Sequence, residues 1–154
     1  MVQISNVYSH KNGEVIFENK EGHLELYKAI ETCGYIFQKG APPRIKKHMV
    51  KYLTGKQWAD KVRVGNSRLT INFLKQRIGV CFQIGNVART YADILKLDHL
   101  GNQNIIDVGL IIVPDEYESR ILGTNYANYE RLKNEVILFK NEIQTPLVIL
   151  GICN

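Results

Sequence analysis

The feature that most constrains the fold lies between Ile71 and Leu95, where an alternating stretch is followed by a glycine and a helix-like segment. Apolar side chains alternate with small or polar ones through the run Ile78-Gly79-Val80-Cys81-Phe82-Gln83-Ile84. A period of two places successive side chains on opposite faces of a β-strand. We therefore expect a strand over 78–84 that Gly85 ends, with one row of side chains in a core and the other in a cleft. Cys81 and Gln83 belong to the cleft row.

The residues on either side extend this strand into a larger unit. Gly65-Asn66-Ser67 predicts a loop before a first strand that begins near Leu69, so 70–85 should form a hairpin. After Gly85, Asn86 is suited to cap a helix over 87–97. Apolar spacing predicts that Tyr91, Ile94 and Leu95 pack on the sheet.

The remaining pattern predicts a mixed α/β fold in one domain over residues 1–154. The N-terminal segment from Val2 to Phe17 predicts a strand, a turn and a short second strand at 15–17, as a hairpin or with the first strand on the main sheet. Further helices are expected at 24–31, 42–54, 117–122 and 129–139, and further strands at 105–113 and 145–152. A mixed sheet flanked by helices accommodates this order.

Composition is that of an ordinary globular protein, with 45% hydrophobic and 23% charged residues. No apolar run reaches the roughly 18 residues of a membrane span, and the first residues do not form a signal peptide, so we expect a cytoplasmic protein. Cys33, Cys81 and Cys153 are odd in number and lack metal-ligand spacing, which predicts three reduced thiols.

Positive charge is concentrated in one segment. From Lys39 to Arg77 there are eleven basic residues and one acid, Asp60, so this segment has a net charge of +10. The net charge of the whole chain is +5, so the remaining residues together carry −5. Pro42 and Pro43 are suited to begin a helix, with Ile45, Met49 and Leu53 inward and a basic face outward. The basic residues of that face are Arg44, Lys46, Lys47 and Lys51. Such a face could follow a DNA backbone, or it could be an ordinary solvated helix face.

Six segments in one order resemble a known family. The run from Asn72 to Gly85, NFLKQRIGVCFQIG, is similar to the catalytic hairpin D-F-V-K-D-R-(I/V)-x-(I/L)-E-V-Q-F-G of the BglII/BstYI family of type II restriction endonucleases. The other segments that resemble this family are Val7–Gly13 (VYSHKNG), Gly55–Trp58, Tyr91–Ile94, Ile106–Gly109 (IDVG) and Pro146–Ile152 (PLVILGI). The resemblance implies a PD-(D/E)XK fold in which two acidic side chains hold magnesium against the scissile phosphate of DNA. It also implies a segment shortened between the basic helix (42–54) and the hairpin (70–85).

The two family acids are replaced. Asn72 stands at the family's metal-binding Asp and Cys81 at its catalytic Glu, whereas Gln83 retains the family residue. An amide brings no negative charge and a thiolate is a soft ligand, so neither suits magnesium. We interpret this as natural degeneration of the site. Asp93, at the family's matching helix position, is either a displaced catalytic acid or the partner in a structural hydrogen bond.

The resemblance also extends the predicted DNA surface beyond the basic helix. It adds Lys75, Arg77, Asn86, Arg89, Asn125 and Tyr126, the last two in a polar loop similar to the family's S-S-G-x-x-Y-(F/Y)-E segment. The family works on palindromes as two-fold dimers, so we expect a homodimer or a heterodimer with a related nuclease subunit. In the family the N-terminal helices contribute to the dimer interface; core packing is the alternative role for these helices here.

Three functions follow as hypotheses. The first is a DNA-binding pseudo-nuclease without a cofactor, acting as a regulator, a decoy or a silent subunit. The second is an active magnesium-dependent type II restriction endonuclease that uses Asp93 with Gln83. The third is a protein-interaction module on a nuclease scaffold.

Overall fold

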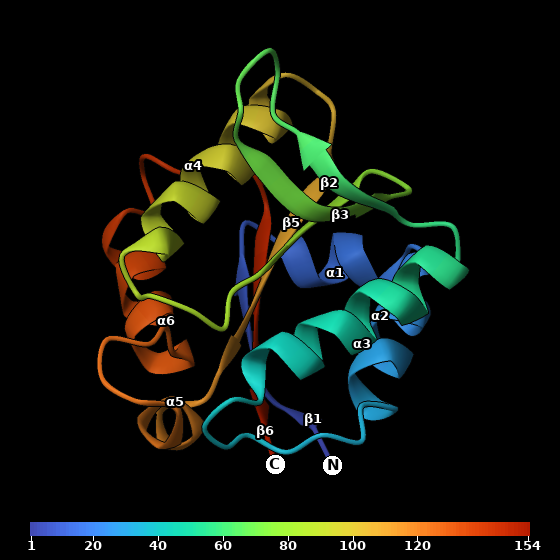
Figure 1. Cartoon of the computed structure of the whole chain (residues 1–154). Helices are drawn as coiled ribbons and strands as arrows, with labels where there is room; N and C mark the ends of the chain where they lie inside the picture. The colour runs from blue at the N-terminus through green and yellow to red at the C-terminus, as the bar shows by residue number, and fades with distance from the viewer.

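The computed structural model describes all 154 residues and contains one six-stranded sheet. The strands are β1 (Gln3–His10), β2 (Ala59–Arg63), β3 (Thr70–Lys75), β4 (Ile78–Phe82), β5 (Val108–Pro114) and β6 (Leu147–Cys153). Their order in the sheet is β1-β6-β5-β4-β3-β2 (Figure 1). The three strands in the middle, β4, β5 and β6, are parallel, and the outer pairings are antiparallel.

Helices cover both faces of this sheet (Figure 1). They are α1 (Gly13–Glu18), α2 (Gly22–Glu31), α3 (Pro42–Gly55), α4 (Arg89–Asn102), α5 (Glu116–Leu122) and α6 (Tyr129–Leu138). One hydrophobic core joins α1, α2 and α3 to the sheet, and a second joins α4 and α6 to its other face. Every residue of β5 is buried, as expected for a parallel strand covered on both faces. The predicted class, a mixed sheet flanked by helices, is confirmed.

Helix α3 forms as the sequence predicts. Pro42 and Pro43 lie in its first turn and Gly55 is its last residue. Ile45, Met49 and Leu53 are its buried residues and belong to the first core. Burial of this apolar stripe fixes which of the basic side chains of α3 can face the sheet.

The N-terminal segment corrects one prediction. The first strand pairs with β6 on the main sheet, so the hairpin alternative is wrong. The expected second strand at 15–17 is part of helix α1 instead. Gly13 and Phe17, four residues apart, are the buried residues of α1, whereas Val15 is 61% exposed. The two buried residues lie on one side of a helix, and their burial outweighs the preference of the β-branched residues at 15–16 for a strand.

Strand β2 is a further difference, because the sequence analysis expected no strand there. Its side chains are mostly exposed, and it lies at the sheet edge paired only with β3. An edge strand with little burial has no clean apolar alternation, which explains why the pattern did not reveal it.

Helix α4 begins at Arg89, two residues later than expected, and it turns a different set of side chains toward the sheet. Its buried residues are Thr90, Asp93, Ile94, Leu97 and Leu100. Of the three residues predicted to pack on the sheet only Ile94 does so; Tyr91 is 42% and Leu95 is 69% exposed. A polar pair, Thr90 and Asp93, occupies sheet-facing positions that an apolar pattern cannot identify. Asn86 does not cap the helix but accepts the Ala88 N–H at 2.8 Å in a turn before it.

No helix in the structure combines the length and the apolar character that crossing a membrane would require. The three cysteines form no disulfide, and Cys33 and Cys81 are buried.

Candidate nucleic-acid cleft

The hairpin of β3 and β4 opens at Asn72 and Cys81. The antiparallel ladder ends at the Phe73–Val80 pair, so Asn72 and Cys81 lie where the strands separate. The Asn72 amide fills this gap, because its Oδ1 accepts the Phe82 backbone N–H at 2.8 Å. Asn72 therefore lies at the floor of the cleft with its oxygen already bonded to the backbone.

Cys81 does not line the cleft as predicted. The side chain is fully buried in the second core, with the apolar residues of α4 and α6. Burial, together with the nearby negative charge of Asp93, raises the pKa of the Cys81 thiol well above its ordinary value. The thiol therefore stays neutral and packs as a small apolar group. The alternation does hold for the opposite row, since Ile78, Val80 and Phe82 all lie in the first core.

Gln83 and Asp93 meet in the cleft. The Gln83 Nε2 donates to Asp93 Oδ2 at 2.7 Å, and the Lys96 Nζ lies 3.0 Å from Asp93 Oδ1. Lys96 also donates to the Thr70 carbonyl oxygen at 2.9 Å. The Asp93 side chain is 5% exposed, so its charge is held by these two donors rather than by bulk water. Of the two alternative roles predicted for Asp93, this geometry matches the structural hydrogen bond.

Two adjoining hollows form the cleft. The first, which we call the Asn72 hollow, has a volume of about 410 Å³ and is lined by Lys46, Arg68, Leu69, Thr70, Asn72, Phe82, Gln83, Arg89, Ala92, Asp93 and Lys96. The second, which we call the Lys61 hollow, has a volume of about 580 Å³ and is lined by Pro43, Lys46, Lys47, Val50, Asp60, Lys61, Thr70, Ile71 and Asn72. The two hollows share Lys46, Thr70 and Asn72, so they are parts of one depression between α3 and α4.

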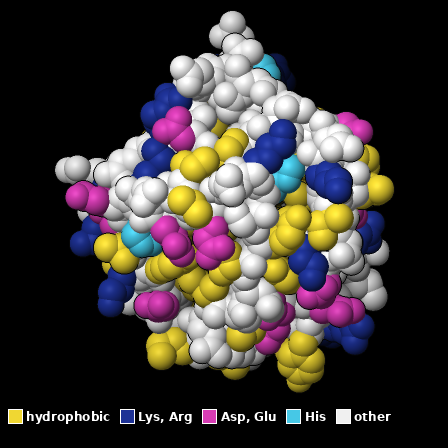
Figure 2. Space-filling model, turned by 180° about the vertical axis from the view of Figure 1, so that it is seen from behind, with side chains coloured by type: hydrophobic (Ala, Val, Ile, Leu, Met, Phe, Trp, Pro, Cys, Tyr) yellow, Lys and Arg dark blue, Asp and Glu magenta, His cyan; other side chains and the backbone are white.

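Each of the two hollows is lined by cations that have no ion-pair partner. They are Lys46, Lys47, Lys61, Arg68 and Arg89, which we call the cleft cations, and no carboxylate oxygen lies within 4.0 Å of any of them. On the face opposite the view of Figure 1, by contrast, basic side chains are interspersed with acidic and apolar ones (Figure 2). The cleft is therefore a local concentration of uncompensated positive charge.

The structure separates the basic residues that the sequence grouped together. Lys46 and Lys47 line the cleft, whereas Arg44 and Lys51 line only a different hollow, which Lys47 also borders. Their position follows from the buried stripe of the helix, which leaves Arg44 and Lys51 facing away from the sheet.

Lys75 and Arg77 do not reach the cleft either. Lys75 Nζ lies 2.9 Å from Glu25 Oε2, and Arg77 lies 2.8 Å from Asp107 Oδ1. The Arg77 hydrogen bond to Asp107 lowers the pKa of that carboxyl and raises the pKa of the guanidinium. Neither residue lines the Asn72 hollow or the Lys61 hollow. Both therefore serve as structural ion pairs at the β3–β4 turn.

The predicted polar loop lies beside the cleft and is tied to the loop that follows β4. Asn86 and Tyr126 form an isolated β-bridge, and the Val87 N–H donates to the Asn125 carbonyl oxygen at 2.7 Å. The structure thus brings Asn86 close to Asn125 and Tyr126, although the sequence separates Asn86 from this pair by about forty residues.

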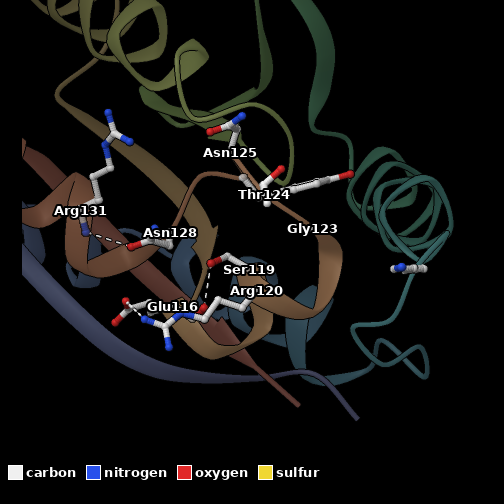
Figure 3. Close-up of a pocket in the computed structure, with 10 residues that line it drawn as sticks. Glu116, Ser119, Arg120, Gly123, Thr124, Asn125, Asn128 and Arg131 are labelled. Carbon is white, nitrogen blue, oxygen red and sulfur yellow. Dashed lines mark hydrogen bonds and ion pairs between the residues drawn. The ribbon is translucent and has the colours of Figure 1, made fainter.

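The loop that contains Asn125 and Tyr126 borders a third hollow of about 590 Å³ (Figure 3). Its lining is polar and includes Lys39, Thr124, Asn125, Arg120 and Arg131. Arg120 pairs with Glu116 and Arg131 pairs with Glu135, and only Lys39 of the three cations has no such partner.

A divalent cation does not fit the donors present in the cleft. The Asn72 oxygen is bonded to the backbone, the Cys81 thiol is neutral and buried, and each Asp93 oxygen has a donor. No group of three or more His, Cys, Asp or Glu side chains could hold a metal ion anywhere in the chain. A hard cation such as magnesium requires several oxygen ligands with negative charge, whereas each hollow offers a single carboxylate, the compensated Asp93 in the Asn72 hollow and Asp60 in the Lys61 hollow.

Sequence reasoning missed Lys96, Arg68 and Lys61. Lys96 follows Asp93 by three residues, a spacing that places both side chains on one helix face, so the sequence did contain a signal for this pair. Lys61 lies in strand β2, which the sequence did not predict, and Arg68 lies in the turn that follows this strand. Only the folded chain brings the two residues to the cleft.

Comparison with known proteins identifies the family and supports the fold. The model of the family described as "Restriction endonuclease BglII/BglIII" matches residues 5–152. The crystal structure of restriction endonuclease BglII complexed with a DNA 16-mer superposes with a TM-score of 0.86 at 13% identity, over 100% of this chain and 77% of the other. The crystal structure of free BglII superposes with a TM-score of 0.74 at 13% identity, over 98% of this chain and 78% of the other. A search of curated proteins gives no match. The chain therefore belongs to the BglII/BglIII family of restriction endonucleases.

Proposed function

We propose that this chain binds double-stranded DNA in the cleft between α3 and α4 and does not hydrolyse it. Family membership supports DNA as the ligand, and one of the similar solved structures is a complex with DNA. The observation that carries the proposal is the state of Asp93, the only carboxylate in the Asn72 hollow. Gln83 and Lys96 already hold it, while five cleft cations have no ion-pair partner.

The chemistry of hydrolysis lacks its components in this cleft. Phosphodiester cleavage in such a site depends on a metal ion that activates water and stabilises the developing charge on the phosphate. Asn72 and Cys81 provide neither a negative ligand nor a base, because the first is bonded to the backbone and the second is a buried neutral thiol. Binding, in contrast, requires only accessible cations, and these are present.

One pair of assays tests this proposal. Titration of a labelled duplex into the protein should show binding that weakens with added salt, and supercoiled plasmid should remain uncut with magnesium or manganese. Absence of duplex binding at low salt would contradict the proposal and favour a protein-interaction module. Nicked or linear plasmid would instead support an active nuclease.

The active-nuclease alternative retains one specific observation in its favour. Asp93 and Gln83 both line the Asn72 hollow, so a carboxylate and an amide do face the position a phosphate would occupy. Cleavage by wild-type protein that disappears in Asp93→Asn would establish this alternative. The proposed function predicts no cleavage by either protein.

We further propose that the chain pairs with a second copy of itself. Support comes from apolar side chains that α4 and the end of α6 leave exposed around a hollow of about 210 Å³, among them Tyr91, Leu95 and Phe139. The N-terminal helices instead place Phe17, Leu26 and Ile30 in the first core. Light scattering should give the mass of a dimer, and Leu95→Glu should give a monomer. A monomeric wild type would contradict self-pairing and leave a related nuclease subunit as the partner.

A further inference from the structure

The most unusual group in the cleft is the half-buried ammonium of Lys96. Its side chain is 16% exposed, less than that of any other ion-paired lysine or arginine in the chain. The ammonium lies 3.0 Å from Asp93 Oδ1 and donates to the Thr70 carbonyl oxygen at 2.9 Å. It therefore links α4 to the start of β3 across the floor of the Asn72 hollow.

We propose that Lys96 takes the place of a divalent cation in this cleft, so that a DNA phosphate can approach Asp93 without any metal ion. This inference rests on the proposed function, because it concerns how the cleft accepts DNA. A carboxylate in a poorly hydrated cleft repels a phosphate strongly unless a positive charge lies beside it. In this chain the positive charge is covalently part of the protein.

The surrounding contacts support this role over that of an ordinary surface ion pair. Gln83, the residue after β4, holds the second oxygen of Asp93, so the carboxylate is fixed from two sides. Lys96 is held by two oxygen acceptors from two different elements, α4 and β3. Because the pair is fixed in this way, the ammonium remains beside the carboxylate whether or not DNA is bound.

The consequence is a cleft whose affinity for DNA is not increased by divalent ions. A site with an uncompensated carboxylate binds DNA better when magnesium or calcium neutralises that charge. With Lys96 in place, Asp93 contributes no net repulsion. Magnesium should therefore not strengthen duplex binding, and added salt should weaken it.

Duplex binding by three proteins tests the inference, measured in EDTA and in magnesium at equal ionic strength. Wild type should bind no more tightly in magnesium than in EDTA. Lys96→Met keeps the length of the side chain and removes its charge, and we expect it to bind about tenfold or more weakly in EDTA. The double variant Asp93→Asn with Lys96→Met removes both charges, and it should recover to within about threefold of wild type.

A matched control separates this effect from the loss of any lysine. Lys133 forms the same type of i,i+3 pair with Glu130 at 3.2 Å on α6, outside the cleft, so Lys133→Met should leave DNA affinity unchanged. The double variant also answers the concern that Lys96→Met fails to fold, since it leaves no unpaired buried charge. Far-ultraviolet circular dichroism verifies the fold of each variant.

Two outcomes would overturn the inference but leave the proposed function intact, and a third would overturn both. Stronger wild-type binding in magnesium than in EDTA would show that Lys96 does not replace a metal. A double variant as weak as Lys96→Met would show that Lys96 is an ordinary phosphate contact. Wild-type protein that binds no duplex in either buffer would overturn the proposed function itself, and the inference with it.

Discussion

The salt dependence of DNA binding is the quantity that the cleft predicts most directly. Lys46, Lys47, Lys61, Arg68 and Arg89 line the depression and have no carboxylate within 4.0 Å. A cation already paired with an acid gains little from a phosphate, whereas an unpaired one releases a counterion from the DNA when it makes contact. The number of unpaired cleft cations therefore sets the upper limit of the electrostatic contribution.

The magnitude follows from this number. Each phosphate contact adds about −0.9 to the slope of log affinity against log salt for duplex DNA, so five contacts give a slope of about −4.5. Between about 50 mM and 200 mM salt, such a slope lowers the affinity roughly 500-fold. Removal of one cation, as in Lys46→Gln, should make the slope shallower by about one unit.

Fluorescence anisotropy of a labelled duplex over a series of salt concentrations measures the slope. Lys46→Gln and Arg89→Gln should each reduce it, because Lys46 borders both hollows and Arg89 lies on the opposite wall. Lys140→Gln is a suitable control, since Lys140 is exposed at the end of α6 and lines none of these hollows. A wild-type slope near zero, or an equal change in the control, would refute the assignment of the cleft as the DNA surface.

Three further predictions concern stability and can be measured by urea or thermal unfolding. Cys81→Glu restores the family acid but buries a carboxylate in the second core, so it should lower the free energy of unfolding by about 3–5 kcal/mol; a variant as stable as wild type would contradict this burial. Gly13→Ala places a methyl group against the Leu147 backbone and should cost about 1–3 kcal/mol, whereas Gly34→Ala, which meets no atom, should not. The Arg77 hydrogen bond lowers the pKa of Asp107, so the bond stabilises the fold above the ordinary pKa of 3.8 and is lost as the pH falls through the lowered value. The stability deficit of Asp107→Asn should accordingly vanish at low pH, and a deficit that persists there would exclude the ionic origin.

The parts of the fold that the sequence predicts well are those where burial is regular. In β4 the apolar row reaches the first core, and in α3 the i, i+4, i+8 stripe is the buried face. Periodicity fails where burial is partial or polar. Strand β2 is an exposed edge, and α4 turns Asp93 toward the sheet and Leu95 toward solvent.

The site was only partly predictable for a related reason. The alternating pattern identifies Gln83 as a cleft residue, and the resemblance to the family identifies Asn72. The sequence cannot show that β3 and β4 separate at Asn72, nor that Cys81 lies on the buried side of that opening. The role of each basic side chain is harder still to predict, because a count of charges does not reveal which of them form ion pairs with acidic residues. Lys75 and Arg77 do, through Glu25 and Asp107 on other elements.

Asn72 and Cys81 differ from the cleft cations in what the fold gains from them. Asn72 accepts a hydrogen bond from a backbone N–H, and Cys81 fills space in the core, so both side chains contribute to stability. The cleft cations do the opposite, because unpaired like charges around one depression repel one another and weaken the compact state. A fold that no longer required a nucleic acid would gain stability by replacing any of them. Their presence beside an internally neutralised Asp93 is therefore best explained by a polyanion that compensates them when it binds.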